Sequence, residues 1–299
     1  MDFALQPSTS AVPFPPMPRL RIVLLTFGDR IETHWQAHHC LLTTMAHAPA
    51  DTEYVLVTDR ADHYRWFAGR VRFLPVDPAQ LAIWKGAHGF FWRVKLEAVL
   101  AAARLDGVGS AHTCYLDSDI LCRQPLTDLV AALAVGDTFM HLQESVFSHA
   151  RRSSHRTLRD HLVGKSIAGL PITGDNAMWN AGVVAVGAGQ VDLLVRALAL
   201  CDAIITADYT HRLAEQFAFS AALQSSGRLR PAEAWFDHYW ANKPGFQQSI
   251  TEQLATFLVR GMGVDEAVAF ARANPIRRPL SVRRRWYHRL FAPLAGRPG

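Results

Sequence analysis

Residues 114–121 read CYLDSDIL, an apolar run that carries two carboxylates, Asp117 and Asp119, one residue apart. Alternate side chains of a strand face the same way, so both carboxylates would address one ion. Hard cations such as Mg²⁺ and Mn²⁺ prefer carboxylate oxygen, and phosphate oxygens and water commonly complete their coordination. We therefore expect a buried strand that ends in a divalent-metal site, with a solvated turn as the alternative interpretation.

Strand-like and helix-like segments alternate on both sides of this run. Upstream, apolar runs that read as strands lie at 19–29, 53–59 and 70–77, and helical spacing is found at 31–48 and 91–103. Downstream, PLTDLVAALA at 125–134 reads as a helix with a proline near its start. This alternation predicts an α/β, Rossmann-like fold with a mostly parallel central sheet and helices on both faces.

Acidic residues end several of the predicted strands. Asp29 and Asp59 close the first two, and Asp117 and Asp119 close the strand at 114–121. Ligands of open α/β sheets bind at the carboxyl ends of the strands. We therefore expect the functional site at that edge of the sheet.

The second half of the chain is less regular. HLQESVF at 141–147 and WNAGVVAVG at 179–187 are expected as strands, 150–175 as a polar loop, and 191–205 and 211–227 as helices. Three histidines, His34, His38 and His39, lie in the first half of the helix expected at 31–48. We expect these histidines on its exposed surface.

Length and composition fit one large α/β domain. The chain has 299 residues, 49% of them apolar, which is enough to bury a substantial core. We divide it into a disordered Pro- and Ser-rich lead-in at 1–18, one domain at 19–270 and a basic tail at 271–299. The four cysteines are scattered without a CxxC pair, which indicates reduced thiols. The N-terminal residues lack the regions of a signal peptide, so we expect a cytoplasmic protein.

The net charge of +5 is concentrated in the tail. Residues 272–299 contain eight arginines and no acidic residue, so the rest of the chain is slightly acidic and no nucleic-acid partner is expected. SVRRRWYHRLFAPLAG at 281–296 has apolar residues at helical spacing, the pattern of a basic amphipathic helix on an anionic membrane surface. We expect peripheral docking on the inner face of the membrane, with a disordered tail as the alternative.

The order of several motifs resembles the glycosyltransferases of the GT-A fold, most nearly the retaining family 8 that includes glycogenin and bacterial lipopolysaccharide galactosyltransferases. FWRVKLEAVL at 91–100 is similar to that family's helix with a basic residue ahead of its Asp-x-Asp strand. WNAGVVAVG is similar to its Asn-Ala-Gly strand, and AEQFAFSAAL at 214–223 to its Asp-Gln helix. The resemblance spans about residues 21–243, and the order of motifs is more specific than any one of them.

The resemblance implies roles for residues at matching positions. Asp117, Ser118 and Asp119 would meet the metal and the donor diphosphate, with Arg93 or Lys95 near the diphosphate or the sugar. Thr26, Phe27, Gly28 and Asp59 would hold the nucleoside, and Asn180 and Gly182 would line the sugar pocket. Gln216 falls where the family has a residue at the lower face of the reacting sugar, with Glu215 in place of the usual Asp. Asp119, Asn180 and Gln216 are therefore the candidate catalytic residues.

The family's site ends with a His-x-x-Gly-x-x-Lys-Pro segment, whose His completes the metal shell and whose Lys touches phosphate. The nearest match here is His238-Tyr-Trp-Ala-Asn-Lys243-Pro244, which is one residue shorter and lacks the Gly. Imidazole suits Mn²⁺ and lysine suits phosphate as a point charge. The resemblance thus implies His238 as a metal ligand and Lys243 as a phosphate contact. The alternatives are a packed core histidine, and a plain turn in which Gly182 supplies an unusual backbone angle.

The leading hypothesis is metal-dependent transfer of a hexose from a nucleotide diphosphate sugar, expected to be a UDP-sugar, to a hydroxyl of a glycan or glycolipid acceptor. Mn²⁺ or Mg²⁺ would neutralise charge that grows on the departing nucleoside diphosphate. Retention of anomeric configuration is implied by the resemblance alone.

Three alternatives stay open. A catalytically silent glycan-binding or membrane-adaptor protein would keep the same fold. A phosphohydrolase of the haloacid dehalogenase type would have Thr or Val after its Asp-x-Asp, where this chain has Ile120. A sugar nucleotidyltransferase would need a Gly-rich basic loop after the first strand. A dinucleotide oxidoreductase is disfavoured because no GxGxxG follows the first strand, and no P-loop is present.

Overall fold

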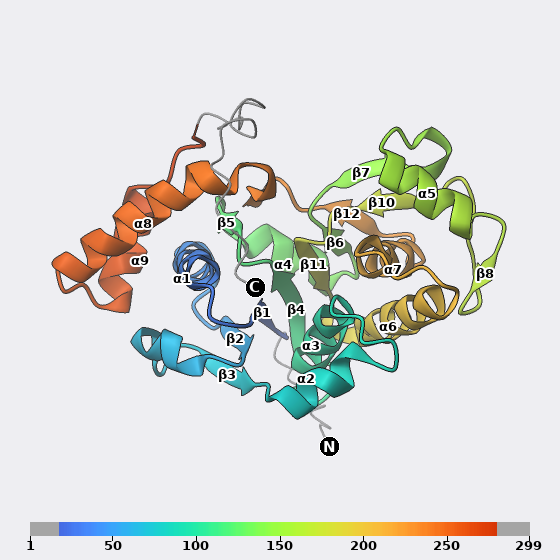
Figure 1. The fold of residues 1–299 in the computed structure, drawn as a ribbon. Coiled ribbons are helices and arrows are strands. Elements are labelled where there is room, and N and C mark those ends of the chain that lie inside the picture. Colours follow the sequence, from blue (N-terminus) through green and yellow to red (C-terminus); the bar gives the residue numbers. More distant parts are fainter. Residues whose placement is uncertain (1–17, 280–299) are drawn as a thin grey trace, which may run out of the picture.

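Seven strands form the central sheet of the computed structural model, which describes residues 18–279 (Figure 1). Their order across the sheet is β12-β6-β11-β4-β1-β2-β3. Strand β11 runs antiparallel to both of its neighbours, and the other pairs are parallel. The predicted mostly parallel sheet is therefore confirmed. Its strands are β1 (Arg19–Thr26), β2 (Glu53–Thr58), β3 (Arg72–Pro75), β4 (Ala111–Leu116), β6 (Thr138–Met140), β11 (Val183–Val186) and β12 (Leu229–Pro231).

Helices cover both faces of this sheet, as predicted (Figure 1). Alternate residues of one strand face opposite helical layers. Val23 packs in the cluster that contains α3, α6 and α7, whereas Ile22 and Leu24 pack in the cluster that contains α1, α4 and α9. The helices are α1 (Ile31–Met45), α2 (Pro78–Lys85), α3 (Arg93–Ala103), α4 (Thr127–Ala134), α5 (Ser153–Leu162), α6 (Val191–Thr206), α7 (Leu213–Gln224), α8 (Lys243–Val259) and α9 (Val264–Ala273).

Short strand pairs extend from the carboxyl edge of the sheet. Two of them carry residues of the candidate site: β5 pairs antiparallel with β13, and β7 pairs antiparallel with β10. A third pair, β8 with β9, forms a small hairpin. These strands are β5 (Ile120–Cys122), β7 (Gln143–Val146), β8 (Ser166–Ile167), β9 (Leu170–Pro171), β10 (Ala177–Trp179) and β13 (Phe236–His238).

Residues 150–175, expected as a polar loop, contain α5 and the β8–β9 hairpin, so that expectation is wrong. Helix α5 buries His155, Leu158 and Leu162, which lie three and four residues apart on one face. Basic and polar residues fill the other positions and hide this sparse apolar pattern in the sequence. Helices α8 and α9 were not anticipated either.

The three histidines His34, His38 and His39 of α1 were expected on its exposed surface, but they are buried or partly buried. His34 lies between the Tyr64 hydroxyl and the Gly28 carbonyl, each 2.8 Å from a ring nitrogen. His39 contacts Gln253 of α8 at 2.9 Å, and both His34 and His39 are 1% exposed. His38 is partly buried against the His63 carbonyl. The prediction failed because α8 and the segment around residues 61–67 (η1, Ala61–Phe67) cover the outer side of α1.

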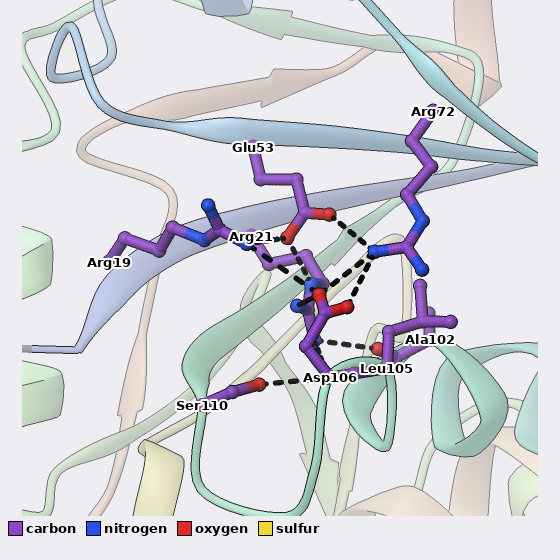
Figure 2. A network of polar contacts seen from close by, with 8 residues as sticks. All are labelled: Arg19, Arg21, Glu53, Arg72, Ala102, Leu105, Asp106 and Ser110. Carbon is purple, nitrogen blue, oxygen red and sulfur yellow. Dashed lines mark hydrogen bonds and ion pairs between the residues drawn. The ribbon is translucent and has the colours of Figure 1, made fainter.

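A network of ion pairs closes the opposite edge of the sheet, at the start of β1 (Figure 2). The fully buried Arg21 contacts Glu53 at 2.6 Å and Asp106 at 3.0 Å, and it donates to the carbonyls of Ala102 and Leu105. Arg19 and Arg72 add exposed contacts to the same two carboxylates. This cluster joins β1, β2 and β3 to the end of α3, far along the strands from Asp117.

The packed chain continues beyond residue 270. Ile276 is buried, its carbonyl accepts a 2.7 Å hydrogen bond from Arg123, and Arg278 pairs with Asp237 at 2.6 Å. All of the predicted lead-in except residue 18, and the whole predicted amphipathic segment at 281–296, lie outside the described residues. Among residues 18–279, no helix is long and apolar enough to cross a membrane.

Candidate metal centre

Asp117 and Asp119 lie in the turn that joins β4 to β5. Strand β4 ends at Leu116, and the amide of Ile120 donates to the Asp117 carbonyl at 3.2 Å. The two side chains therefore converge through a tight turn, and the expected convergence through strand alternation is wrong. The turn is fixed on its other side, because the Asp117 amide donates to the Gly182 carbonyl at 2.8 Å.

His238 completes a group of three side chains that could hold one metal ion. Ligand atoms of Asp117, Asp119 and His238 all lie within 4.8 Å of one another. His238 Nε2 is 3.4 Å from Asp119 Oδ1 and 3.8 Å from Asp117 Oδ2. The pairing of β13 with β5 sets this approach, because it aligns His238 with Ile120, the residue after Asp119.

Asn180 orients the imidazole of His238. Its Oδ1 lies 2.8 Å from His238 Nδ1 and also accepts from the Gly182 amide at 3.0 Å. An oxygen acceptor at Nδ1 puts the proton there, which leaves the Nε2 lone pair facing the two carboxylates. Metal-binding histidines usually have their second nitrogen held in this way.

Gly182 leaves the space that His238 occupies. A Cβ on Gly182 would lie 2.3 Å from both Cε1 and Nδ1 of the His238 ring. Gly182 does not adopt a left-handed backbone conformation, so the turn interpretation based on an unusual angle is wrong. The glycine is required because a side chain would displace the imidazole.

Lys95 joins Asp117 to Glu215 beneath the turn. Its ammonium lies 3.1 Å from Asp117 Oδ1 and 3.2 Å from Glu215 Oε1, and it donates to the Ala181 carbonyl at 2.7 Å. Burial alone would lower the pKa of Lys95, but the two carboxylates outweigh it and raise that pKa. Burial, helped by Asp117, raises the pKa of Glu215 to about 7 despite Lys95. The Tyr115 hydroxyl donates to Asp117 at 2.6 Å.

Arg93, the alternative to Lys95, is directed elsewhere. It pairs with Asp202 of α6 at 2.6 Å and with Glu97 at 2.7 Å, and it donates to the Trp84 carbonyl. It does not line the cavity beside the carboxylates, whereas Lys95 does. Two residues apart on α3, the two side chains thus have different partners: Arg93 forms an ion pair with α6, and Lys95 forms one with Asp117.

Lys243 approaches the other carboxylate. Its Nζ lies 2.8 Å from Asp119 Oδ2, and its side chain is 47% exposed. Burial acts to raise the pKa of Asp119, but His238 and Lys243 outweigh it and lower that pKa. Asp119 is therefore an ionised, almost fully buried carboxylate at neutral pH, which suits a metal ligand.

A cavity of about 600 Å³ opens over these groups. Of the predicted site residues, the cavity wall contains Phe27, Lys95, Asp117, Asp119, Asn180, Gly182, Gln216, His238 and Lys243. Residues from both halves of the chain therefore meet around one hollow, at the edge that the carboxyl ends of the parallel strands predict.

The remaining predicted residues lie behind this wall. Thr26 is buried and its hydroxyl contacts Thr58 and Tyr64. Asp59 accepts the Gly28 amide at 3.0 Å, and Gly28 has a φ of 74°. Ser118 also stays outside the cavity lining. Thr26, Gly28 and Asp59 thus shape the end of β1, where Phe27 reaches the cavity.

Glu144 is the main cavity residue that the sequence did not single out. It accepts from Asn180 at 3.2 Å and from Gln216 at 3.1 Å, and it lies 3.4 Å from both His155 and Arg152. Burial opposes its ionisation, but these neighbours lower the pKa of Glu144 to about 2. Asn180 therefore connects two parts of the cavity: its oxygen faces His238, and its amide nitrogen faces Glu144.

No protein-family model matches the chain, and no curated protein is significantly similar to it. The family resemblance therefore stays a prediction.

Proposed function

We propose that this protein is a metal-dependent glycosyltransferase of the GT-A fold, which transfers a hexose from a nucleotide diphosphate sugar, UDP-linked, to a hydroxyl of a glycan or glycolipid. The observation that carries the proposal is the convergence of Asp117, Asp119 and His238 within 4.8 Å on the wall of a 600 Å³ cavity. The motif order across the chain supports the same assignment.

The chemistry of the three side chains fits Mn²⁺ or Mg²⁺. Two carboxylates and one imidazole form a mixed oxygen and nitrogen donor set, and Mn²⁺ accepts both. The space at Gly182 and the Asn180 contact hold the imidazole against the carboxylates. A cation bound there would offset the negative charge that develops on a departing diphosphate.

The cavity wall offers suitable groups for a donor on either side of this centre. Lys243 is half exposed beside Asp119, so its ammonium can contact a phosphate oxygen. Phe27 and Phe91 meet edge to face at the end of β1, with ring centroids 6.4 Å apart, and both line the cavity. Such rings offer apolar surface to a nucleobase. Glu144, Asn180 and Gln216 offer hydrogen-bonding groups for sugar hydroxyls.

The proposal is tested by incubating the purified protein with UDP-, GDP-, ADP- and dTDP-hexoses and Mn²⁺, and by measuring the released nucleoside diphosphate chromatographically. We expect slow donor hydrolysis with one UDP-hexose, accelerated by an acceptor glycan and abolished in Asp119→Ala. Binding without turnover of any donor would favour the catalytically silent alternative. Release of inorganic phosphate from sugar phosphates would favour the phosphohydrolase.

A further inference from the structure

The cavity lining contains four cationic side chains and four carboxylates, Asp117, Asp119, Glu144 and Glu215, and the cations are not evenly paired with these acids. Four lysines and arginines line the cavity: Lys95, Arg152, Arg212 and Lys243. Lys95 pairs with Asp117 and Glu215, and Lys243 pairs with Asp119. Arg152 lies 3.4 Å from Glu144, an acid that also contacts His155, Asn180 and Gln216. Within residues 18–279, no ion pair is found for Arg212.

Two different elements bring the arginines to the cavity, and both elements contact Glu144. Arg152 precedes α5 and contacts Glu144 directly. Arg212 precedes α7 and lies four residues before Gln216, so the two side chains share a helix face. Gln216 donates to Glu144 at 3.1 Å. The arginines are thus at the Glu144 side of the cavity, and the metal-binding side chains are at the other side of Asn180.

An exposed aromatic ring adjoins this charge. The Arg152 guanidinium lies 6.0 Å from the ring centroid of Trp240, which is 48% exposed and lines the cavity. Three large aromatic side chains are exposed among the described residues: Phe91, Trp92 and Trp240. All three line the cavity. An exposed tryptophan in a concave site marks a binding surface better than a scattered surface residue does.

We infer that Arg152, Arg212 and Trp240, here called the cationic wall, form a subsite for a saccharide that carries a phosphate or carboxylate group. A guanidinium binds either anion through two parallel hydrogen bonds. The indole face of Trp240 packs against the C–H face of a sugar ring. This subsite is assigned to the acceptor, which rests on the proposed function, since the side of the cavity that carries Asp117, Asp119 and His238 is then left for the donor.

The test measures saccharide binding to the purified protein by calorimetry, without metal or nucleotide. The probes are glucose 6-phosphate, glucuronate, glucose and inorganic phosphate. We expect at least one of the two anionic sugars to bind tenfold or more tightly than glucose and than phosphate, and the better of the two identifies the anion. Arg212→Gln should raise its Kd at least tenfold, and Trp240→Ala should weaken it as well. Arg65→Gln, an exposed arginine outside the cavity, is the matched control.

Four results of the saccharide titrations would overturn the inference. They are equal binding of glucose and both anionic sugars, no binding of either anionic sugar at millimolar concentration, tight binding of phosphate alone, and an unchanged Kd in Arg212→Gln. UDP binding with Mn²⁺ is measured separately on the same variants and should be unchanged in Arg212→Gln. Loss of UDP binding in that variant would assign the arginine to the donor diphosphate and contradict the inference. Failure of wild type to bind UDP would count against the proposed function only.

Discussion

Gly182 and His238 are in such close contact that a single methyl group on the glycine would reach the imidazole, with a Cβ 2.3 Å from two ring atoms. Gly182 also holds Asp117 through its carbonyl and Asn180 through its amide. One glycine therefore sets the distance between the β4–β5 turn and β13, the two segments that supply the candidate metal ligands.

Gly182→Ala should displace His238 and weaken Mn²⁺ binding by about 10- to 100-fold, the usual effect of disturbing the support of a ligand. Calorimetric titration with Mn²⁺ measures this change. Gly189→Ala is the matched control, because a Cβ there meets nothing within 4 Å. Equal Mn²⁺ affinity in the two variants would show that His238 is not a ligand.

Lys243→Gln should weaken nucleotide binding without weakening metal binding. The variant loses the ammonium 2.8 Å from Asp119, so Mn²⁺ should bind as well as before or more tightly. UDP in the presence of Mn²⁺ should bind roughly tenfold more weakly, because a hydrogen bond to a charged group contributes about 1.5 kcal/mol or more. Lys165→Gln, an exposed lysine outside the cavity, serves as the control. Parallel losses of both affinities would contradict the assigned role.

Much of this arrangement follows from local sequence pattern, and part of it does not. The strand–helix alternation predicts the sheet, and acidic residues at the strand ends predict the edge at which Asp117 and Asp119 lie, although not the turn that carries them. His238 could be proposed only through a family resemblance, because its approach depends on the pairing of β13 with β5 across more than a hundred residues.

Glu144 shows what the sequence could not reveal. A single glutamate in a short polar strand has no spacing pattern that separates it from a surface residue. It reaches Asn180 because β7 pairs with β10, and it reaches His155 because α5 folds back over β7. The sparse apolar face of α5 was itself unrecognised, so Arg152 could not be placed near the cavity. Arg212 has no visible signal beyond its position at the start of the helix predicted at 211–227.

Arg21→Met should destabilise the protein by about 3 kcal/mol or more, because it leaves Glu53 and two carbonyls of the α3 end without their buried partner. Arg72→Met removes an exposed contact of the same network (Figure 2) and should cost less than about 1 kcal/mol. Urea unfolding of both variants measures the difference. Similar costs for the two, or a changed Mn²⁺ affinity in folded Arg21→Met, would contradict a purely structural role.

Acidification should destabilise the protein through His39, a buried histidine of α1. Burial lowers the pKa of His39 to about 4, from an ordinary value of 6.5. Between these values the unfolded chain binds more protons than the folded one, so the stabilising contribution is complete above pH 6.5 and is lost as pH falls toward 4.

His39→Gln should therefore reduce the slope of unfolding free energy against pH between 6.5 and 4.5, whatever its effect on stability at pH 7. Urea midpoints at several pH values give this slope. His161→Gln provides a comparison, since His161 is only partly buried. An unchanged slope in His39→Gln would mean that His39 does not titrate as its burial requires.

We propose that Asp117, Asp119 and His238 bind a cation that in turn binds a nucleoside diphosphate. The most direct measurement is the melting temperature of wild type, Asp117→Ala and the exposed-site control Asp62→Ala, each with UDP and UDP-hexoses, with and without Mn²⁺. A ligand at 100 times its Kd stabilises the folded state by about 2.7 kcal/mol, which raises Tm by several degrees. We predict this rise for wild type and Asp62→Ala with Mn²⁺ present, and none for Asp117→Ala. No rise with any nucleotide, or an equal rise without Mn²⁺ or in Asp117→Ala, would contradict the account.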